Sequence, residues 1–422
     1  MKSIVITGTD GRPIDREQLK AAVIGTLEGR ELSKVLVIPP DFTRFHSMAG
    51  LITEMYYDIL HEKCVVDILP ALGTHEPMTP AECREMFGDI PFDRFIRHDW
   101  INDVVKIGEV PAEFVHEVSE GLVNESIPVE VNGRLLDESY DLIISVGQVV
   151  PHEVVGMANY SKNIFIGCGG RRMINSSHML GAFYGMERIM GKDFSPVRKV
   201  LDYAEENFIK DMPLIYFLTV TTAVGDKVDI HGVFAGRDRK LFEDAVELSQ
   251  KVNLNYLEQA PSKIVVYLNE KEFKSTWLGN KAVYRTRMAI ADGGELLILA
   301  PGVHKFGEDD KIDGLIRKYG YVGRENVLEL VKTEEDLRAN LSAAAHLIHG
   351  SSDCRFRITY AVAGMSEDEI RGVNYNYADY GEMAARYMPG KLKDGWNEVD
   401  GESIYYISNP ALGLWAERKR FV

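Results

Sequence analysis

The chain has 422 residues, of which 45% are hydrophobic and 27% charged, as in an ordinary globular protein. That length predicts two or three domains of roughly 150 residues each. The 48 lysines and arginines stand against 64 aspartates and glutamates, and the formal net charge of −16 argues against a nucleic-acid partner. Disorder, collagen and coiled coil are excluded by the same composition.

The cysteines and the apolar stretches predict the cellular compartment of the protein. Four scattered cysteines without a C-x-x-C pair fit a reducing cytoplasm better than a disulfide framework or a zinc ribbon: Cys64, Cys83, Cys168 and Cys354. The N-terminus has no apolar export region. The longest apolar stretch, Leu214–Val224, is shorter than the roughly 20 residues that a membrane span needs. We therefore expect a cytoplasmic protein with no membrane partner.

Apolar runs rich in valine and isoleucine alternate with helical patterns in the first half of the chain. These runs predict strands at Val35–Pro39, Val65–Leu69, Leu142–Val146 and Ile164–Gly167. Helices are predicted at Met48–Glu62 and from Thr79, where a Thr-Pro-Ala-Glu sequence is typical of a capped helix start. The alternation indicates an α/β fold.

The same alternation restarts near Pro261. It predicts strands at Ile264–Leu268, Glu295–Ala300 and Arg357–Ala361, and helices at Gly279–Ala291, Thr333–His346 and Asn374–Met388. The fold class predicted is therefore two α/β domains with mostly parallel sheets, residues 1–258 and 259–422. We expect roughly the last 20 residues to pack back on the first domain, and the active site to lie in the cleft between the domains.

The loop after the first buried strand reads Asp41-Phe42-Thr43-Arg44. One interpretation is a strand-to-helix turn in which Asp41 caps the helix. The other is an anion-binding turn, with Arg44 holding a carboxylate or phosphate through two hydrogen bonds. Turn chemistry leaves both open.

Two further loops carry histidines. His75 lies between a glycine turn and a helix start, where a histidine is more often hydrogen-bonded than catalytic. A later segment holds His152, Lys162 and His178, with Gly169 and Gly170 allowing close approach of a ligand to the backbone.

Sequence spacing limits the ligands that these loops predict. The glycine-rich turn lacks the third glycine of a dinucleotide fingerprint, because Arg172 stands there, although a mononucleotide phosphate still fits. No two of the three histidines are closer than 26 residues, which supports no closed zinc site. One histidine on a metal, with the other two moving protons, fits the sequence equally well.

Together these motifs resemble the nickel-pincer-nucleotide-dependent lactate racemase family, whose members racemise or epimerise 2-hydroxy acids. The family's D-x-T-R motif corresponds to Asp41–Arg44, its first histidine loop to Gly73–Pro77, and its Pro-His dipeptide to Pro151-His152. Ten residues further on, Lys162 corresponds to the family's cofactor lysine, and His178 follows it by 16 residues, as the nickel ligand does.

The resemblance implies a pyridinium mononucleotide with two sulfur-containing arms that hold nickel, with His178 as the protein's ligand to the metal. Lys162 would bind an arm, covalently or by hydrogen bonding. Asp41, Thr43, Arg44, Gly169 and Gly170 would contact the cofactor, and its biosynthetic enzymes become indirect partners. His75 and His152 would exchange the hydroxyl proton while the C2 hydrogen moves reversibly as hydride.

The resemblance also bears on the substrate. Lys281 occupies the place of the family's substrate-carboxylate lysine, and Arg44 would join it. Leu278 stands where family members carry glutamine, and the segment before Lys162 is more polar than in lactate racemases, with Asn159, Tyr160 and Ser161. Both departures favour a sugar acid such as gluconate over lactate.

Two other classes compete with this interpretation. A zinc- or manganese-dependent lyase or hydrolase would use His75, His152 and His178 as metal ligands, and it would need a carboxylate or an open water position that no pattern supplies. A non-catalytic binder would capture sugar acids with Arg44 and Lys281, but binding alone gives paired histidines no purpose.

Overall fold

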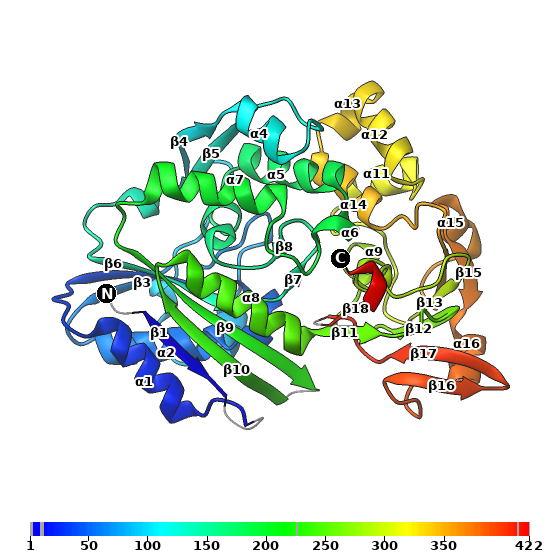
Figure 1. The fold of residues 1–422 in the computed structure, drawn as a ribbon, viewed down its shortest axis with the longest axis horizontal. Helices are drawn as coiled ribbons and strands as arrows, with labels where there is room; N and C mark the ends of the chain where they lie inside the picture. Colours follow the sequence, from blue (N-terminus) through cyan, green and yellow to red (C-terminus); the bar gives the residue numbers. More distant parts are fainter. Residues whose placement is uncertain (1–2, 9–11, 225–226, 412, 422) are drawn as a thin grey trace. The chain divides into compact units, whose positions relative to one another are not determined.

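The computed structural model describes residues 3–8, 12–224, 227–411 and 413–421. The chain forms two compact units. The first comprises Met1–Tyr184 and Arg188–Asn253, and the second comprises Gly185–Glu187 and Leu254–Val422. Both contain mixed α/β structure, and each is described here by itself (Figure 1).

A six-stranded sheet forms the centre of the first unit. Its order is β1 (Ile4–Thr7), β10 (Lys227–Gly236), β9 (Leu214–Val224), β6 (Leu142–Gln148), β2 (Lys34–Ile38) and β3 (Val65–Ile68). The four strands β9, β6, β2 and β3 run parallel, whereas β10 is antiparallel to both of its neighbours. The carboxyl ends of the parallel strands therefore share one edge of the sheet.

Both faces of this sheet are covered by helices. Val35 and Val37 of β2 join a core with α1 (Arg16–Leu27) and α2 (Ala49–Leu60). Leu36 and Ile38 point the other way, into a core that includes residues of α7 (Pro196–Ala204) and α8 (Arg239–Asn253). Figure 1 shows α1 and α2 on one side of the sheet and α8 on the other. Because side chains alternate along a strand, a strand buried on both faces becomes an uninterrupted apolar run.

Smaller elements complete the first unit. The antiparallel pair β4 (Val104–Val110) and β5 (Ile127–Asn132) packs against α5 (Arg171–Tyr184), and the short hairpin β7 (Pro151–His152) and β8 (Gly156–Met157) follows β6. The remaining helices include α3 (Pro80–Phe87), α4 (Ala112–Val118), the 3-10 helix η1 (Phe42–Ser47) and two π-helices, η4 (Asn163–Gly167) and η5 (Glu205–Ile209).

The second unit has its own six-stranded sheet. Its order is β15 (Asn376–Asp379), β14 (Arg357–Val362), β13 (Glu295–Ala300), β12 (Lys263–Tyr267), β17 (Glu402–Ile407) and β16 (Gly395–Val399), all parallel except β16. Residues of α16 (Tyr380–Tyr387) pack on one face. Its other helices include α9 (Thr276–Gly279), α10 (Lys281–Thr286), α11 (Asp310–Tyr319), α12 (Arg324–Thr333), α13 (Glu335–Arg338), α14 (Leu341–His349) and α15 (Glu367–Gly372).

The predicted class, α/β with mostly parallel sheets, is confirmed, and most predicted strands lie within two residues of their observed bounds. The helix start at Thr79 is also confirmed, because Thr79 and Glu82 form a reciprocal capping box. The division into units follows Asn253 rather than residue 258, and places Gly185–Glu187 with the second unit. The predicted active-site cleft between domains stays a prediction.

The end of the chain forms β18 (Leu414–Glu417), which pairs in parallel with β11 (Leu254–Leu257). The predicted boundary at residue 258 places 254–257 in the first domain, and roughly the last 20 residues are predicted to pack there. Both strands lie in the second unit, so the C-terminal pairing is internal to that unit.

Four predicted elements differ from the structure. Ile164–Gly167 is not a strand but part of the π-helix η4, because a short apolar run does not distinguish a buried strand from a buried helix. The helix predicted at Gly279–Ala291 ends at Thr286 in α10, and that predicted at Thr333–His346 divides into α13 and α14. Asn374–Met388 begins with the strand β15 and becomes helical only at Tyr380.

Among the residues that the structure describes, no helix is both long enough and apolar enough to cross a membrane.

Candidate functional site

The polar loops of the first unit follow the carboxyl ends of its parallel strands. Asp41 and Arg44 follow β2, His75 follows β3, and His152 and Lys162 follow β6. Such an edge is where ligands bind in open α/β sheets. The charges of the ionisable groups among them, together with His178, influence one another's pKa values, so these side chains form one cluster.

Asp41 and His75 form the tightest contact of the cluster. The His75 Nδ1–H donates to Asp41 Oδ2 at 2.5 Å, and the Thr43 hydroxyl donates to Asp41 Oδ1 at 2.6 Å. Burial raises the pKa of Asp41, but the His75 and Thr43 hydrogen bonds and the charge of Arg44 outweigh it and hold that pKa below the ordinary value. An ionised carboxylate only accepts, so the His75 Nε2 keeps a free lone pair, and the ring is 56% exposed.

The Asp41→Asn substitution is expected to lower stability in a pH-dependent way. The folded pKa of Asp41 lies below 3.8, so the carboxylate stabilises the fold above pH 3.8 and loses that effect as the pH falls through the folded pKa. We expect a loss of about 1–3 kcal/mol in the free energy of unfolding at pH 7. Urea unfolding across pH measures it, with the surface variant Asp238→Asn as control. A loss that did not shrink in acid would contradict the expectation.

Lys162 stands at the first turn of the π-helix η4. Its ammonium has no hydrogen-bond or ion-pair partner in the described part of the chain, and burial together with the charge of Arg44 lowers its pKa to about 8. The next residue, Asn163, fixes this turn, because its side-chain amide donates to the Ile38 carbonyl at 3.0 Å and to Ser145 Oγ at 2.9 Å. The helix is thereby attached to the end of β2 and to the middle of β6.

His152 is buried, with 6% of its surface exposed. The Val154 N–H donates to its Nδ1 at 3.1 Å, so the neutral ring carries its hydrogen on Nε2. Burial holds the pKa of His152 well below its usual value, with smaller decreases from Lys162, Arg44 and His178. The carboxylate of Glu153, 3.7 Å from Nδ1, acts in the opposite direction. His152 therefore presents an Nε2–H, whereas His75 presents a bare nitrogen.

His178 lies in the middle of α5, and its ring donates a hydrogen bond within that helix. Its Nδ1–H donates to the Ile174 carbonyl at 2.7 Å, which leaves the Nε2 lone pair free. Burial and the charge of Lys162 lower the pKa of His178, although the Ile174 hydrogen bond and Glu153 act against them. A neutral imidazole fixed through its other nitrogen to a carbonyl is the usual state of a metal-binding histidine.

Arg44 is the uncommitted group of the first loop. Its guanidinium is partly buried, and in the described residues it has no hydrogen-bond or ion-pair partner. Asp41 and Thr43, by contrast, are occupied with each other and with His75. The interpretation in which the Asp41 side chain caps the following helix is wrong, because its carboxylate accepts from Thr43 and His75 and makes no cap hydrogen bond, whereas Arg44 is available to an anion.

Gly169 and Gly170 have packing reasons to be glycine. A Cβ on Gly169 would lie 1.8 Å from the Phe165 carbonyl oxygen, and one on Gly170 would lie 2.4 Å from Glu130 Oε2. Glu130 also accepts from the Arg172 N–H at 3.1 Å and from the Arg172 guanidinium at 2.7 Å. The start of α5 is therefore already occupied by a carboxylate of the protein, and the predicted contact of both glycines with a cofactor stays a prediction.

Gly169→Ala is expected to destabilise the first unit by about 3 kcal/mol, since a backbone carbonyl has to move. The matched control is Gly133→Ala, whose added Cβ would meet its nearest neighbours at an ordinary 3.6 Å. Urea unfolding of both variants measures the difference. Equal stability, with ligand retention lost only in Gly169→Ala, would instead show that Gly169 serves a ligand.

The predicted substrate residue Lys281 belongs to the second unit. It begins α10, is partly buried, and its Nζ lies 5.6 Å from the centre of the Phe273 ring. Leu278 lies in the preceding short helix, where its N–H is capped by Ser275. The structure places these residues only within their own unit.

The polar residues before Lys162 face the protein rather than an open site. The Ser161 hydroxyl accepts from Arg198 at 2.7 Å and donates to Asp202 at 3.1 Å. The Tyr160 ring lies against Tyr216 and Phe242. The expectation that these hydroxyls contact a longer substrate finds no support in their contacts.

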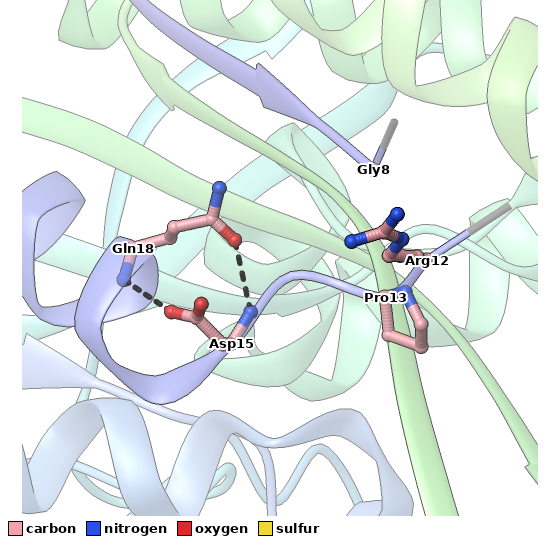
Figure 2. Close-up of a pocket in the computed structure, with 5 residues that line it drawn as sticks. All are labelled: Gly8, Arg12, Pro13, Asp15 and Gln18. Atoms are coloured by element: carbon pink, nitrogen blue, oxygen red, sulfur yellow. Dashed lines mark hydrogen bonds between the residues drawn. The ribbon is translucent and has the colours of Figure 1, made fainter. Parts of the chain in front are cut away.

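A hollow in the surface elsewhere on this unit carries no such chemistry. Figure 2 shows it at the start of α1, lined by Gly8, Arg12, Pro13, Asp15 and Gln18. Asp15 and Gln18 are engaged in a reciprocal capping box, with the Gln18 N–H donating at 2.8 Å and the Asp15 N–H at 3.1 Å. The hollow contains none of the clustered residues.

Sequence reasoning missed three residues that shape the cluster. Glu153 adds a negative charge beside His152, and its position next to that histidine was a usable signal. The Asn163 amide bonds to Ile38, which lies 125 residues earlier in the chain, and the Arg198 guanidinium bonds to Ser161, which lies 37 residues earlier. No local pattern announces contacts at such separations.

These features define a class of protein: an α/β protein that gathers histidines, a lysine and an arginine at the carboxyl ends of parallel strands. Residues 11–188 match the model of the lactate racemase N-terminal domain, so this part of the chain is similar to that domain. No curated protein sequence matches the chain.

Two solved structures are similar to the whole chain. A protein from Thermotoga maritima, determined by a structural genomics consortium, has a TM-score of 0.82 and 25% identity, covering 98% of this chain and 100% of that one. The lactate racemase apoprotein from Thermoanaerobacterium thermosaccharolyticum has a TM-score of 0.69 and 16% identity, covering 97% and 95%. The second likeness concerns the fold alone.

Proposed function

We propose that the protein is an isomerase that inverts C2 of a 2-hydroxy acid, with a nickel-pincer nucleotide as cofactor. The observation that carries the proposal is the arrangement around Lys162. A partly buried amine without a partner lies in one electrostatic cluster with a histidine that presents a free Nε2, His178, and with a buried neutral histidine, His152. The match of residues 11–188 to the lactate racemase N-terminal domain supports the same reaction class.

The residues present fit such a cofactor. His178 would supply one neutral nitrogen to nickel, its ring held by the Ile174 carbonyl, while the sulfur ligands belong to the cofactor itself. Lys162 would hold a thiocarboxyl arm, and Arg44 would bind a phosphate or the substrate carboxylate. When bound, the cofactor supplies the acceptor and donor of the C2 hydrogen.

The protein's own task is then to move the hydroxyl proton. His75 accepts that proton at Nε2, because the Asp41 carboxylate holds its other ring hydrogen and stabilises the imidazolium that forms. On the opposite stereoisomer His152 takes this part. To do so, Nδ1 must give up the Val154 N–H and carry the ring hydrogen, so that Nε2 is free to take the substrate proton; the Glu153 carboxylate, 3.7 Å from Nδ1, then stabilises the imidazolium.

The substrate proposed is a sugar acid such as gluconate, with its carboxylate held by Arg44 and Lys281. Support comes from Leu278, which replaces the glutamine that the family resemblance leads one to expect. The contacts of Tyr160 and Ser161 do not add to it. These side chains therefore do not define the length of the substrate, and an assay has to determine it.

The experiment that tests the proposal uses full-length protein co-expressed with the cofactor-making enzymes. We expect about one nickel per chain and a sulfur-to-nickel charge-transfer absorption band, since soft sulfur donors with imidazole suit nickel. A panel of 2-hydroxy and sugar acids then identifies the substrate. In D2O the inverted product should keep its C2 hydrogen, because only the hydroxyl proton passes through the histidines.

A lyase or hydrolase with zinc or manganese is the alternative, and bound zinc in a colourless protein would favour it. That function asks for several protein ligands on one ion. Within the described ranges, no three His, Cys, Asp or Glu side chains are grouped to hold a metal. A non-catalytic sugar-acid binder is the third class, and ligand binding without any inversion in cofactor-loaded protein would indicate it.

A further inference from the structure

The turn that precedes Lys162 is conformationally strained. Asn159 and Tyr160 have φ angles of 66° and 58°, two consecutive left-handed residues, neither of which is glycine. Each costs on the order of 1–2 kcal/mol, so the surrounding structure must hold the turn. The π-helix η4 begins immediately afterwards. Strained turns and π-helices both concentrate at functional sites.

One side chain makes three hydrogen bonds to the turn. Arg198 of α7 is fully buried, and its guanidinium donates to the Met157 carbonyl at 2.7 Å, the Asn159 carbonyl at 3.1 Å and Ser161 Oγ at 2.7 Å. These three acceptors surround the left-handed pair. A planar fork of donors serves three acceptors at fixed directions, whereas the three donors of a lysine ammonium rotate freely.

Arg198 is itself rigidly mounted. Its N–H donates to Ser195, the cap of α7, at 3.0 Å, and its guanidinium lies over the Phe242 ring at 4.4 Å. Its charge has no carboxylate in direct contact among the described residues. Instead, Ser161 donates onward to Asp202, which also accepts from Arg239 at 3.0 Å. A buried cation bound to neutral acceptors is costly for a fold, so packing alone does not account for it.

We infer that Arg198 positions Lys162: it holds the turn of residues 157–161 in the one conformation that delivers the Lys162 amine to the histidine cluster. Asn163 fixes the following residue, so Lys162 is held from both sides. The charge of Arg198 also contributes to the lowered pKa of Lys162, after burial and Arg44. The inference rests on the proposed role of Lys162 toward the cofactor, whereas the geometry is independent of the substrate.

The test uses full-length, cofactor-free protein and follows Lys162 directly. Acylation by limiting acetic anhydride, mapped by peptide mass, gives the pH midpoint of Lys162 reactivity in the wild type, Arg198→Met and Arg198→Lys. Arg237→Met is the matched control, because Arg237 also donates to main-chain carbonyls of this unit, those of Ile209 and Met212. Hydrogen exchange of residues 158–163 is measured on the same proteins.

In Arg198→Met we expect the midpoint of Lys162 to rise by about one pH unit or more, and amide exchange in 158–163 to accelerate about tenfold or more. Arg198→Lys should restore part of both, and Arg237→Met should match the wild type at Lys162. Equal midpoints and exchange in Arg198→Met and Arg237→Met would overturn the inference. Should Arg198→Met not fold, Arg198→Lys decides, since wild-type values in that variant also overturn it.

These readouts separate the inference from the proposed function. A protein that never acquires nickel yet shows the expected shift in Lys162 disproves the proposed function and keeps the positioning role. A nickel-loaded, active enzyme whose Lys162 midpoint and amide exchange are unchanged in Arg198→Met supports the proposed function and disproves the positioning role.

Discussion

Replacing His178 with alanine is expected to leave the protein without nickel. Of the clustered histidines, His178 alone is fixed through Nδ1 to a main-chain carbonyl, which keeps Nε2 deprotonated and aimed away from its own helix turn. Without that nitrogen the pincer retains only its own donors. We expect nickel per chain to fall about tenfold or more, because removing a metal ligand should cost at least as much affinity as removing the hydrogen bond that supports it.

The chain offers a close control in His61→Ala. His61 stands at the C-terminal cap of α2 and, like His178, directs Nδ1 to the carbonyl four residues earlier, that of Tyr57 at 2.9 Å, but it lies exposed and outside the cluster. Metal analysis of both variants, co-expressed with the cofactor-making enzymes, should show nickel lost from His178→Ala only. Full nickel in His178→Ala would mean that another group binds the metal.

The parallel strands were predictable because both faces of the first sheet are buried. Val35–Ile38 contributes to two cores, and such a strand cannot show polar alternation. The same reasoning failed at Ile164–Gly167, which is equally apolar and equally buried but forms a π-helix. The difference lies in tertiary contacts: the Asn163 side chain bonds to two strands, β2 and β6, and no local pattern encodes that.

The long strand β9 was missed for a related reason. Threonines interrupt its apolar run, and the run was considered only as a membrane span. In the fold their hydroxyls have defined partners: Thr219 donates to the Ser47 carbonyl at 2.9 Å and Thr221 to Gln148 at 2.8 Å. β-Branched residues suit strands, so the interruption was compatible with one.

The candidate site was predictable in its members but not in its pairings. Asp41, His75, His152 and Lys162 all follow strand ends, and parallel topology brings such loops to one edge. Whether Asp41 bonds to His75 or to a ligand depends on how two loops, 34 residues apart in the chain, are placed against each other. Hydrogen-bond partners of this kind are set by packing, and so is the support that Arg198 gives to the Lys162 turn.

Replacing either His75 or His152 with alanine is expected to stop interconversion while nickel is retained. Each histidine serves one stereoisomer as base and the other as acid, so a full cycle needs both. We expect the rate of inversion to fall by about 10²–10⁴-fold in each single variant, the usual contribution of a positioned acid or base. Chiral chromatography of the product, together with nickel content, measures the two quantities on the same samples.

The two variants should nevertheless differ, because the two histidines are held differently. His75 is backed by an ionised carboxylate at 2.5 Å, whereas His152 must exchange the Val154 N–H for the more distant Glu153. Glu153→Gln should therefore slow inversion as His152→Ala does, though less, and Asp41→Asn should approach His75→Ala. His61→Ala again serves as the control. Wild-type rates in both His75→Ala and His152→Ala would rule out proton transfer by this pair, and would return His75 to the role of an exposed, hydrogen-bonded loop residue.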